Sequence, residues 1–313
     1  MTDIIVVGGG CAGLTAALYA ARAGKSVLVF EAENIGGQIT ASPQIDNYPG
    51  IPHVSGMQFA DSLYEQVIEL GVEIELESVL RIENAPYCKI VITENGRYEC
   101  MAVILATGAR HRALGLPREE QLIGHGISYC AVCDGAFYKD RPVAVVGGGN
   151  TAVSDALFLS SCCESVTIIH RREEFRTDES LLLRAKERSN IHWMTGNVPE
   201  ELLGNDNLTG IRVCSKETGE IRSIAVDALF VAIGQIPENS AFAGLIATDS
   251  TGYLLAGEDC TTNVSGIYAA GDCRTKAVRQ LTTAVADGAN AAMAAWECLS
   301  IFKNKKSGIS GFD

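Results

Sequence analysis

The sequence contains one internal repeat, which restricts the possible folds more than any other feature. Each copy has an apolar run, a glycine-rich turn, a helical run and a second apolar run. In the first copy these lie at residues 4–7, 8–13, 14–23 and 27–30. In the second copy the first apolar run is 143–146, the turn is 147–152, the helical run extends to about 160, and the second apolar run is 166–169. The residue that follows the second run lies 23 positions after the first glycine in both copies, Glu31 after Gly8 and His170 after Gly147. This pattern is typical of βαβ units with parallel strands. We therefore predict an α/β fold with two Rossmann-like dinucleotide-binding domains.

Later apolar strands indicate how the two domains are connected. They lie at 103–108, 229–234 and 266–272. The third has no counterpart in the second copy, and an alanine-rich helical run over about 280–302 follows it. We expect this tail to complete the first domain, so that the second domain is inserted into the first. The chain would cross between the domains near 110–117 and 234–239. Both segments contain glycine and proline, as linkers often do. The predicted domains are 1–112 with 237–313, and 113–236.

Composition argues against several classes of protein. With 47% hydrophobic and 20% charged residues among 313, the chain can bury two cores and does not resemble a disordered protein. A net charge of −13 argues against nucleic-acid binding. A strand begins at Ile4, which leaves no room for a secretory signal, and no run of roughly 18 apolar residues could cross a membrane. We expect a cytoplasmic protein with most of its 11 cysteines free.

The first glycine turn has the pattern of a nucleotide site. Gly8, Gly10 and Gly13 fit GxGxxG between a strand and a helix. The first glycine allows the tight turn, the second lets the backbone approach a pyrophosphate, and the third lets helix and strand pack closely. The helix N-terminus also attracts phosphate charge. Glu31 is placed to accept a hydrogen bond from a ribose and would repel a 2′-phosphate, but it does not separate NAD from FAD.

The second glycine turn differs from the first in the charge that accompanies it. Gly147, Gly149 and the residues Asn150, Thr151 and Ala152 repeat the turn, and the position equivalent to Glu31 is followed by a basic segment. That segment contains His170, Arg171, Arg172 and Arg176. Guanidinium groups match phosphate oxygens bidentately, so this site is predicted to prefer NADPH to NADH. The alternative is a solvated basic helix start.

Cys130 and Cys133, followed by Asp134, form a CxxC pair that can close a small reversible disulfide. Asp134 is placed to exchange a proton with a thiolate, although it could also serve as a turn or helix N-cap residue. A structural zinc would need a second spaced pair, and only the adjacent Cys162 and Cys163 are available. Beside two dinucleotide sites, the pair indicates electron transfer from a nicotinamide to a dithiol.

The motifs taken together resemble one family. They are GGGCAG at 8–13, Gly36-Gly37-Gln38, Asn47-Tyr48-Pro49-Gly50, Ala106-Thr107-Gly108, CAVCDG at 130–135, GGGNTA at 147–152, HRREEFR at 170–176, Gly271-Asp272 and Arg279-Gln280-Leu281. In this combination the chain resembles the low-molecular-weight, bacterial-type thioredoxin reductases, a family of pyridine nucleotide-disulfide oxidoreductases. The match covers nearly the whole chain, and a CxxCDG between two dinucleotide folds is specific where either part alone would not be.

The resemblance implies FAD in the first domain and NADPH in the second. The FAD residues it implies are Gly8, Gly10, Gly13, Glu31, Gln38, Asn47, Asp272, Arg279, Gln280 and Leu281. The NADPH residues are Gly147, Gly149, Asn150, Thr151, Ala152, His170, Arg171, Arg172 and Arg176. No metal is implied. Members of the family are homodimers, and thioredoxin is their protein substrate.

The resemblance also implies roles for the cysteines. NADPH would reduce the flavin and the flavin would reduce the disulfide, with Cys133 facing the flavin, Cys130 attacking thioredoxin and Asp134 handling the proton. Dithiol and nicotinamide must reach the same flavin and the dithiol must also reach a protein. We therefore expect rotation about the two crossings.

Two positions depart from the family pattern, and four alternative interpretations compete with it. Val132 stands where threonine is common, and Cys273 where an apolar residue is common. Peroxiredoxin reductases share this core but usually carry an additional N-terminal dithiol domain. Flavin dithiol oxidases and ferredoxin-fed relatives do not use NADPH, so the intact GGGNTA and HRREEFR motifs argue against both. A non-enzymatic redox sensor would leave the two charge-reversed sites without a joint purpose.

Overall fold

The computed structural model describes residues 1–307, and these divide into two compact units. Unit 1 runs from Met1 to Arg110 and resumes at Ile236, and unit 2 comprises His111–Gln235. The two crossings, β7 (Ala109–His111) and β16 (Gln235–Pro237), pair as a two-stranded sheet. Gly108 and Gly234 precede these strands with φ angles of +72° and +102°, a conformation that favours glycine.

Unit 1 is built on a seven-stranded sheet with the order β3-β2-β1-β6-β5-β4, in which β17 also pairs with β6. Its strands are β1 (Thr2–Val7), β2 (Val27–Phe30), β3 (Glu73–Glu75), β4 (Val79–Asn84), β5 (Lys89–Thr93), β6 (Arg97–Leu105) and β17 (Ile267–Ala269). β1 runs parallel to β2 and β6, which places Ile4 opposite Val27 and Ala102. β17 is parallel to β6, so the prediction that the third apolar strand joins the first sheet is confirmed.

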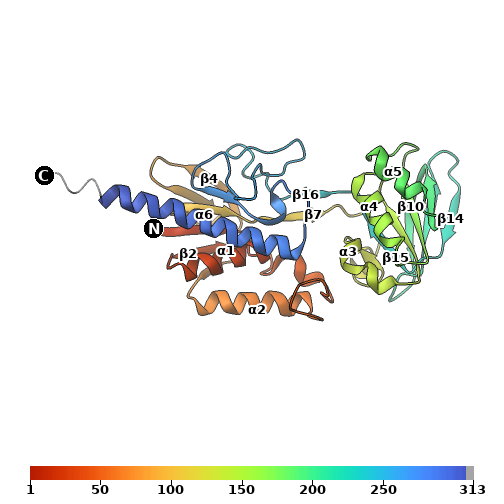
Figure 1. The fold of residues 1–313 in the computed structure, drawn as a ribbon, viewed down its shortest axis with the longest axis horizontal. Coiled ribbons are helices and arrows are strands. Elements are labelled where there is room, and N and C mark those ends of the chain that lie inside the picture. Colours follow the sequence, from red (N-terminus) through yellow and green to blue (C-terminus); the bar gives the residue numbers. More distant parts are fainter. Residues whose placement is uncertain (308–313) are drawn as a thin grey trace. The chain divides into compact units, whose positions relative to one another are not determined.

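Alternation along β1 creates two cores in unit 1. Ile4 and Val6 belong to the core shared with the helices, which are α1 (Cys11–Arg22), α2 (Gly56–Glu69) and α6 (Leu281–Ser307). Ile5 and Val7 belong to the opposite core, which residues of the 242–256 segment close. Figure 1 shows α1 and α6 side by side on one face of the sheet. The predicted strand–turn–helix–strand order of the first copy is confirmed, and Gly24 follows α1 with a φ of +74°.

Unit 2 repeats this plan on a smaller sheet. Its five parallel strands have the order β11-β10-β9-β15-β8. They are β8 (Ile127–Ser128), β9 (Pro142–Val146), β10 (Ser165–His170), β11 (Ile191–Thr195) and β15 (Ala228–Val231). The helices are α3 (Ala131–Asp134), α4 (Asn150–Leu159) and α5 (Glu179–Lys186). The second copy of the repeat, β9–α4–β10, is therefore confirmed as a βαβ unit.

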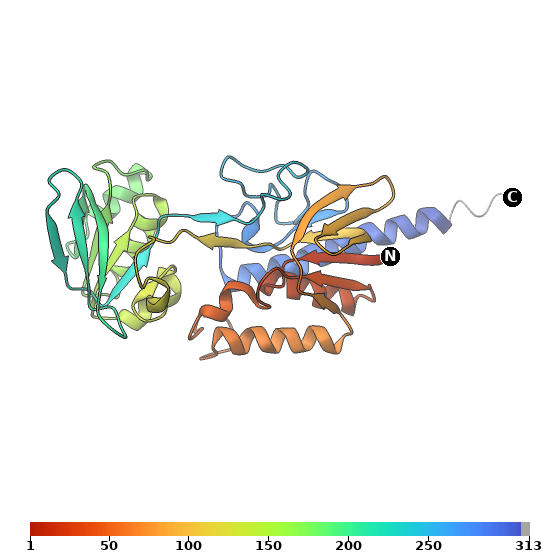
Figure 2. The same ribbon diagram turned by 180° about the vertical axis from the view of Figure 1, so that it is seen from behind.

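The two faces of this sheet are covered differently. Val143 and Val145 of β9 pack in the core that contains α4, whereas Ala144 and Val146 pack against an antiparallel layer. That layer consists of β12 (Asn197–Leu203), β13 (Gly210–Ser215) and β14 (Ile221–Ile224), visible in teal in Figure 2. It was absent from the predicted elements.

Short 3-10 helices lie in the loops of both units, at η1 (Gly37–Ala41), η2 (Glu120–Leu122), η3 (Gly135–Tyr138) and η4 (Gly271–Cys273). Within residues 1–307, no helix combines the length and apolar character needed to span a bilayer.

Candidate active site

The first glycine turn leaves no room for a side chain at Gly8 or Gly13, whereas a Cβ added to Gly10 would meet nothing closer than 3.8 Å. A Cβ added to Gly8 would lie 2.3 Å from the carbonyl oxygen of Ala106, and one added to Gly13 would lie 1.8 Å from that of Gly8. Gly8 also has a φ of +107°. Gly10 is the N-cap of α1, and no side chain caps the helix. The turn therefore presents free helix N–H groups at the end of β1, as an anion site requires.

Glu31, which follows β2, folds back onto this turn. Its Oε2 accepts a 2.6 Å hydrogen bond from the amide of Gly9, and its Oε1 accepts one of 2.8 Å from Glu33. The carboxylate is thereby fixed beside the glycine turn, where the sequence placed it.

Asp272, in η4, carries a buried oxygen with no partner. Its Oδ1 has no hydrogen bond among the described residues. Burial raises the pKa of this carboxyl, although the charges of Lys276 and Arg279 act against the rise. An unpaired buried acceptor is costly unless a ligand supplies the donor.

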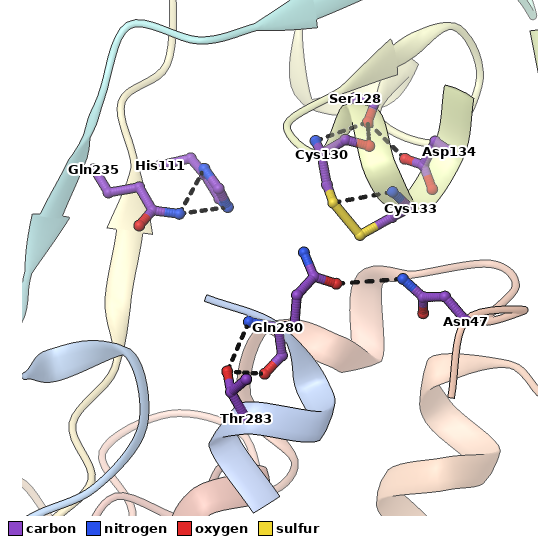
Figure 3. The surroundings of a disulfide bond; sticks show 9 residues. All are labelled: Asn47, His111, Ser128, Cys130, Cys133, Asp134, Gln235, Gln280 and Thr283. Atoms are coloured by element: carbon purple, nitrogen blue, oxygen red, sulfur yellow. Dashed lines mark hydrogen bonds between the residues drawn. A yellow bond between two sulfur atoms is a disulfide. The ribbon is translucent and has the colours of Figure 1, made fainter. Parts of the chain in front are cut away.

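Most of the remaining predicted residues of unit 1 form hydrogen bonds within that unit. Arg279 donates to the carbonyl oxygens of Asp272 (3.4 Å) and Arg274 (3.2 Å), and Asn47 donates to Gln280 Oε1 at 3.3 Å (Figure 3). Gln38 donates to the carbonyl oxygen of Ala109. Leu281 begins α6. The contact between Asn47 and Gln280 joins residues 233 positions apart in sequence, whereas Asp272 and Arg279 are separated by only 7 positions.

The second glycine turn has the same steric character. A Cβ on Gly147 would lie 2.3 Å from the carbonyl oxygen of Ala232 and 2.8 Å from Cβ of Ala152. Gly149 is the N-cap of α4, again without a capping side chain. Thr151 and Ala152 lie in the first turn of that helix.

The basic loop is fastened onto this turn by its backbone and its buried side chains. The amide of Arg176 donates a 2.7 Å hydrogen bond to Gly148, and the Asn150 side chain accepts from Thr177 (2.7 Å) and from the amide of Asp178 (2.9 Å). The His170 ring is buried and occupies the space where a Gly148 Cβ would lie. Burial lowers the pKa of His170, so the ring is neutral near pH 7.

Fixing the loop leaves its guanidinium groups available. Arg171, Arg172 and Arg176 are exposed, and none forms an ion pair with a carboxylate among the described residues. Exposed, unpaired arginines beside an uncapped helix N-terminus form a site suited to a phosphorylated ribose.

Cys130 and Cys133 form a disulfide, with an S–S distance of 2.09 Å and Cα atoms 5.3 Å apart (Figure 3). Cys130 is the N-cap of α3, and its Sγ accepts a 3.2 Å hydrogen bond from the amide of Cys133. Both cysteines are half-buried, and Val132 between them is 51% exposed. The predicted redox pair is present as a bond near the surface of unit 2.

Comparisons with known proteins agree with this geometry. The family model described as pyridine nucleotide-disulphide oxidoreductase matches residues 2–288. The chain belongs to this family. The thioredoxin reductase of Treponema pallidum is 39% identical over 306 residues, covering 96% of this chain and 98% of the relative. The thioredoxin reductase of Peptoclostridium litorale is 39% identical over 300 residues, covering 94% of this chain and 95% of the relative. The crystal structure of thioredoxin reductase from Streptococcus pyogenes has a TM-score of 0.92 at 40% identity, covering 96% of this chain and 98% of that one.

Membership places this chain among the oxidoreductases, and within them it is a member of the thioredoxin reductases. The family implies a flavin and a pyridine nucleotide as cofactors. Two glycine turns that exclude a Cβ at their first glycine, one accompanied by Glu31 and the other by exposed arginines, agree with two different nucleotides.

Several polar residues with unusual environments were missed by sequence reasoning. Ser128 is buried and its hydroxyl donates a 2.6 Å hydrogen bond to Asp134 Oδ2 while accepting one of 3.0 Å from the amide of Cys130 (Figure 3). Asp155, in α4, has a pKa raised to about 7 by burial. Arg274 and Asp287 form a buried ion pair below the Asp272 turn. Only Asp287 had a visible signal, as an acid within an alanine-rich run.

The nine cysteines outside the disulfide are free. Cys162 and Cys163 have their sulfur atoms 3.8 Å apart, and burial raises the pKa of Cys163 to about 12. A thiol with so high a pKa is a poor nucleophile. Among the described residues, no group of three or more His, Cys, Asp and Glu side chains is arranged to hold a metal ion.

Proposed function

We propose that this protein is an NADPH-dependent thioredoxin-disulfide reductase in which electrons pass through FAD and the Cys130–Cys133 disulfide to oxidised thioredoxin. The observation that supports it most is the placement of one disulfide and its acid, Asp134, in the same unit as a glycine turn with unpaired arginines. A disulfide that served only for stability would need neither a half-buried carboxyl next to it in sequence nor a nucleotide turn in the same unit.

We assign FAD to the discontinuous domain 1–112 and 237–313. The adenosine-diphosphate half would bind at Gly8, Gly10, Gly13 and Glu31. Two features of unit 1 fit this group: a turn with no space for a Cβ at Gly8 or Gly13, and the unpaired Asp272 Oδ1, which can accept a hydrogen bond from a ribityl hydroxyl. Gln38, Asn47, Arg279, Gln280 and Leu281 would complete the site nearer the ring. Bound FAD would supply the two-electron chemistry between a nicotinamide and a dithiol.

We assign NADPH to domain 113–236. Its pyrophosphate would bind at Gly147, Gly149 and the start of α4, which comprises Asn150, Thr151 and Ala152. Arg171, Arg172 and Arg176 would bind the 2′-phosphate. The buried, neutral His170 would hold the loop rather than contribute charge, since its ring packs on Gly148.

The dithiol exchange follows from the geometry around α3. In the reduced state the Cys130 thiolate would attack the thioredoxin disulfide, forming a mixed disulfide and releasing one thioredoxin thiolate. The Cys133 thiolate would then attack Cys130 Sγ, release the second thiolate and restore the enzyme disulfide. Two electrons and two protons leave the enzyme in this sequence. Asp134, whose pKa is raised by burial, is placed to give a proton to a departing thiolate.

Three wider features of the relatives are proposed for this chain. We propose a homodimer, a cytoplasmic location, and movement of the two domains about β7 and β16. The glycines at 108 and 234, with positive φ angles, support a hinge at these crossings.

The proposal is tested by anaerobic titration. The purified protein should be yellow, bleach on addition of NADPH, and recover its colour with oxidised thioredoxin. Bleaching with reduced ferredoxin but not with NADPH would contradict the assignment, as would rapid recovery with oxygen and none with thioredoxin.

The cysteine roles need a separate test. Cys130→Ser and Cys133→Ser should each still allow flavin reduction by NADPH but abolish thioredoxin turnover. Cys214→Ser, which alters a half-buried free cysteine on β13, is a matched control and should retain turnover. Turnover in either active-site variant would exclude a catalytic disulfide.

A further inference from the structure

Unit 1 contains a buried cluster of charges that the proposed chemistry does not use. Asp287, on α6, is 3% exposed and accepts hydrogen bonds from Arg274 Nε and Nη2 and from Lys276 Nζ, each at 2.8 Å. The side chain of Arg274 is 1% exposed and that of Lys276 is 4% exposed. Burial opposes ionisation of Asp287, but the hydrogen bonds from the two cations outweigh it and lower its pKa.

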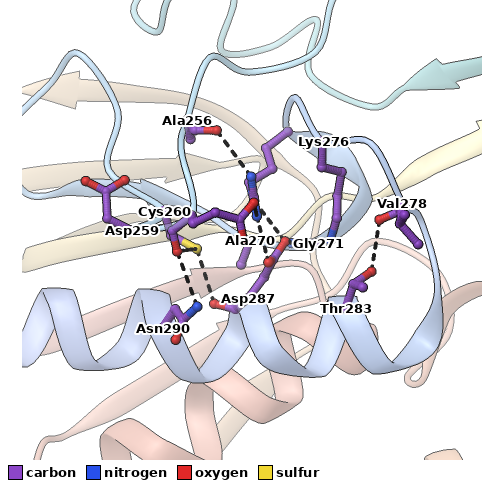
Figure 4. A network of polar contacts seen from close by, with 12 residues as sticks. Ala256, Asp259, Cys260, Ala270, Gly271, Lys276, Val278, Thr283, Asp287 and Asn290 are labelled. Carbon is purple, nitrogen blue, oxygen red and sulfur yellow. Dashed lines mark hydrogen bonds and ion pairs between the residues drawn. The ribbon is translucent and has the colours of Figure 1, made fainter. Parts of the chain in front are cut away.

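The same carboxylate holds the turn that carries Asp272. Asp287 Oδ2 accepts a 2.9 Å hydrogen bond from the amide of Gly271 (Figure 4). Gly271 has a φ of +79°, and a Cβ there would lie 2.8 Å from Cβ of Ala12 in α1. The turn is therefore fixed from two sides, by α6 through a carboxylate and by α1 through close packing.

Arg274 extends this support to the next segment. Its Nη1 donates to the carbonyl oxygens of Ala256 (3.2 Å) and Thr275 (2.9 Å), and its own carbonyl oxygen accepts from Arg279. Arg279 in turn lies 4.0 Å above the ring of Tyr253. One carboxylate thus connects the Asp272 turn with the segment that leads to Arg279.

The cluster also explains why Asp272 has an unpaired oxygen although three cations lie close by in sequence. Asp287 engages Arg274 and Lys276, and backbone carbonyls with the Tyr253 ring engage Arg279. If Asp287 lost its charge, these cations would gain by turning to the other carboxylate, Asp272, because a buried cation without a partner is costly.

We propose that Asp287 is a positioning residue for the FAD site, because it fixes the Gly271–Asp272 turn and keeps Arg274 and Lys276 from pairing with Asp272. This inference rests on the proposed function, since it assumes that FAD binds to unit 1. The inference goes beyond the proposed function because it assigns a role to a side chain outside the FAD site.

The test measures FAD binding rather than turnover. FAD is removed, and the dissociation constant of FAD from the folded apoprotein is measured by fluorescence quenching, together with the thermal midpoint of the apoprotein and the visible flavin spectrum. Asp287→Asn removes the charge. The second variant combines Asp287→Asn with Lys276→Met. In wild type, two buried cations and one carboxylate give the cluster a net charge of one positive unit, and the double variant keeps that net charge because only Arg274 stays charged. It should therefore fold even if the single variant does not.

Matched controls isolate the carboxylate. Glu258→Gln also alters a partner of Arg274, at 3.3 Å, but the Glu258 side chain is 89% exposed. Lys276→Met alone leaves Asp287 bonded to both Gly271 and Arg274. We expect both Asp287 variants to bind FAD at least tenfold more weakly, with a shifted flavin spectrum, and both controls to stay within about twofold of wild type.

The outcomes separate the possible failures. If the double variant binds FAD as tightly as wild type, or if Asp287→Asn lowers only the thermal midpoint and leaves the FAD dissociation constant unchanged, the positioning role is wrong. If the wild-type apoprotein itself binds no FAD, the assignment of FAD to unit 1 is wrong. That result is distinct from a failure of the positioning role, in which the wild-type apoprotein binds FAD and the variants bind it equally well.

Discussion

The hydroxyl of Ser128 donates to Asp134 Oδ2 at 2.6 Å and accepts from the amide of Cys130 at 3.0 Å. The Cys130 carbonyl oxygen lies 3.3 Å from this hydroxyl, but the carboxylate is the nearer acceptor for its single proton, while its lone pair accepts from the backbone of Cys130. Ser128 is 3% exposed, so water does not substitute for it. Asp134 and Cys130, for which we propose the roles of acid and attacking cysteine, are consequently connected through one oxygen atom.

Replacing Ser128 should change the pH dependence of thioredoxin reduction. Burial raises the pKa of Asp134 and the Ser128 hydrogen bond opposes that rise, so Ser128→Ala should raise the pKa further. The limb of the pH–rate profile that reports Asp134 should move to higher pH. Because a weaker acid gives up its proton less readily, kcat should also fall, by less than the roughly 10²–10⁴-fold typical of losing the general acid itself. Steady-state kinetics from pH 5 to 9 measure both effects.

Ser128→Thr is the control for this prediction, because it keeps the hydroxyl. It should restore the wild-type profile even if packing lowers its thermal midpoint. A Ser128→Ala enzyme with an unchanged profile would show that Asp134 titrates independently of Ser128.

The loop arginines should determine nucleotide preference. Arg171→Ala, Arg172→Ala and Arg176→Ala should each raise the KM for NADPH by about 10-fold or more, because a charge-assisted hydrogen bond to phosphate contributes about 1.5–3 kcal/mol. The kcat/KM for NADH, which lacks the phosphate, should change little. The exposed Arg188, beyond α5, supplies the control Arg188→Ala. Equal losses with both nucleotides would instead indicate a general disturbance of the loop.

Sequence reasoning succeeded where the signal is local. The run Val27–Phe30 was predicted as a strand and is β2, because four consecutive apolar residues between turns are a strong signal of a buried parallel strand. The antiparallel layer was missed, since β14 is exposed or half-buried throughout and its neighbours become recognisable only when Ile211 and Val213 pack on the β9 face.

Candidate site residues that lie in short sequence motifs could be proposed from the sequence. Residues that meet only through tertiary contacts were missed. Cys130, Cys133 and Asp134 lie within one short motif, and its position beside two glycine turns predicts a redox pair. Asp287 meets Gly271 across 16 residues and Arg274 across 13, and nothing in the spacing of an alanine-rich helix indicates either contact. Such contacts depend on how the 254–276 loops fold over α6.

Asp155 should make stability depend on pH. Burial raises its pKa to about 7 in the folded protein, well above the ordinary value of 3.8. Such a group stabilises the folded state fully below its unfolded pKa, and this contribution is lost as pH rises through 7. Asp155→Asn should therefore gain stability relative to wild type between pH 5 and pH 8, on the order of 2 kcal/mol.

Urea titrations of the FAD-loaded protein at pH 5 and pH 8, without NADPH, measure this gain. Asp61→Asn, at an exposed position of α2, should behave like wild type at both pH values. An Asp155→Asn gain of the same size at both would mean that Asp155 does not titrate in this range.

Gly13 should be intolerant of the smallest side chain, because a Cβ there would lie 1.8 Å from the carbonyl oxygen of Gly8 and 3.2 Å from Cγ1 of Val6. Gly13→Ala must push α1 away from β1, which costs about 1–3 kcal/mol or more by the usual effect of overpacking. Because that displacement also moves the free N–H groups of α1, FAD content should fall together with the thermal midpoint. Gly244→Ala is the matched control, since nothing lies within 4 Å of its added Cβ, and its stability should stay within about 0.5 kcal/mol of wild type. A Gly13→Ala protein that retained full FAD and an unchanged midpoint would contradict the role of this glycine in the nucleotide turn.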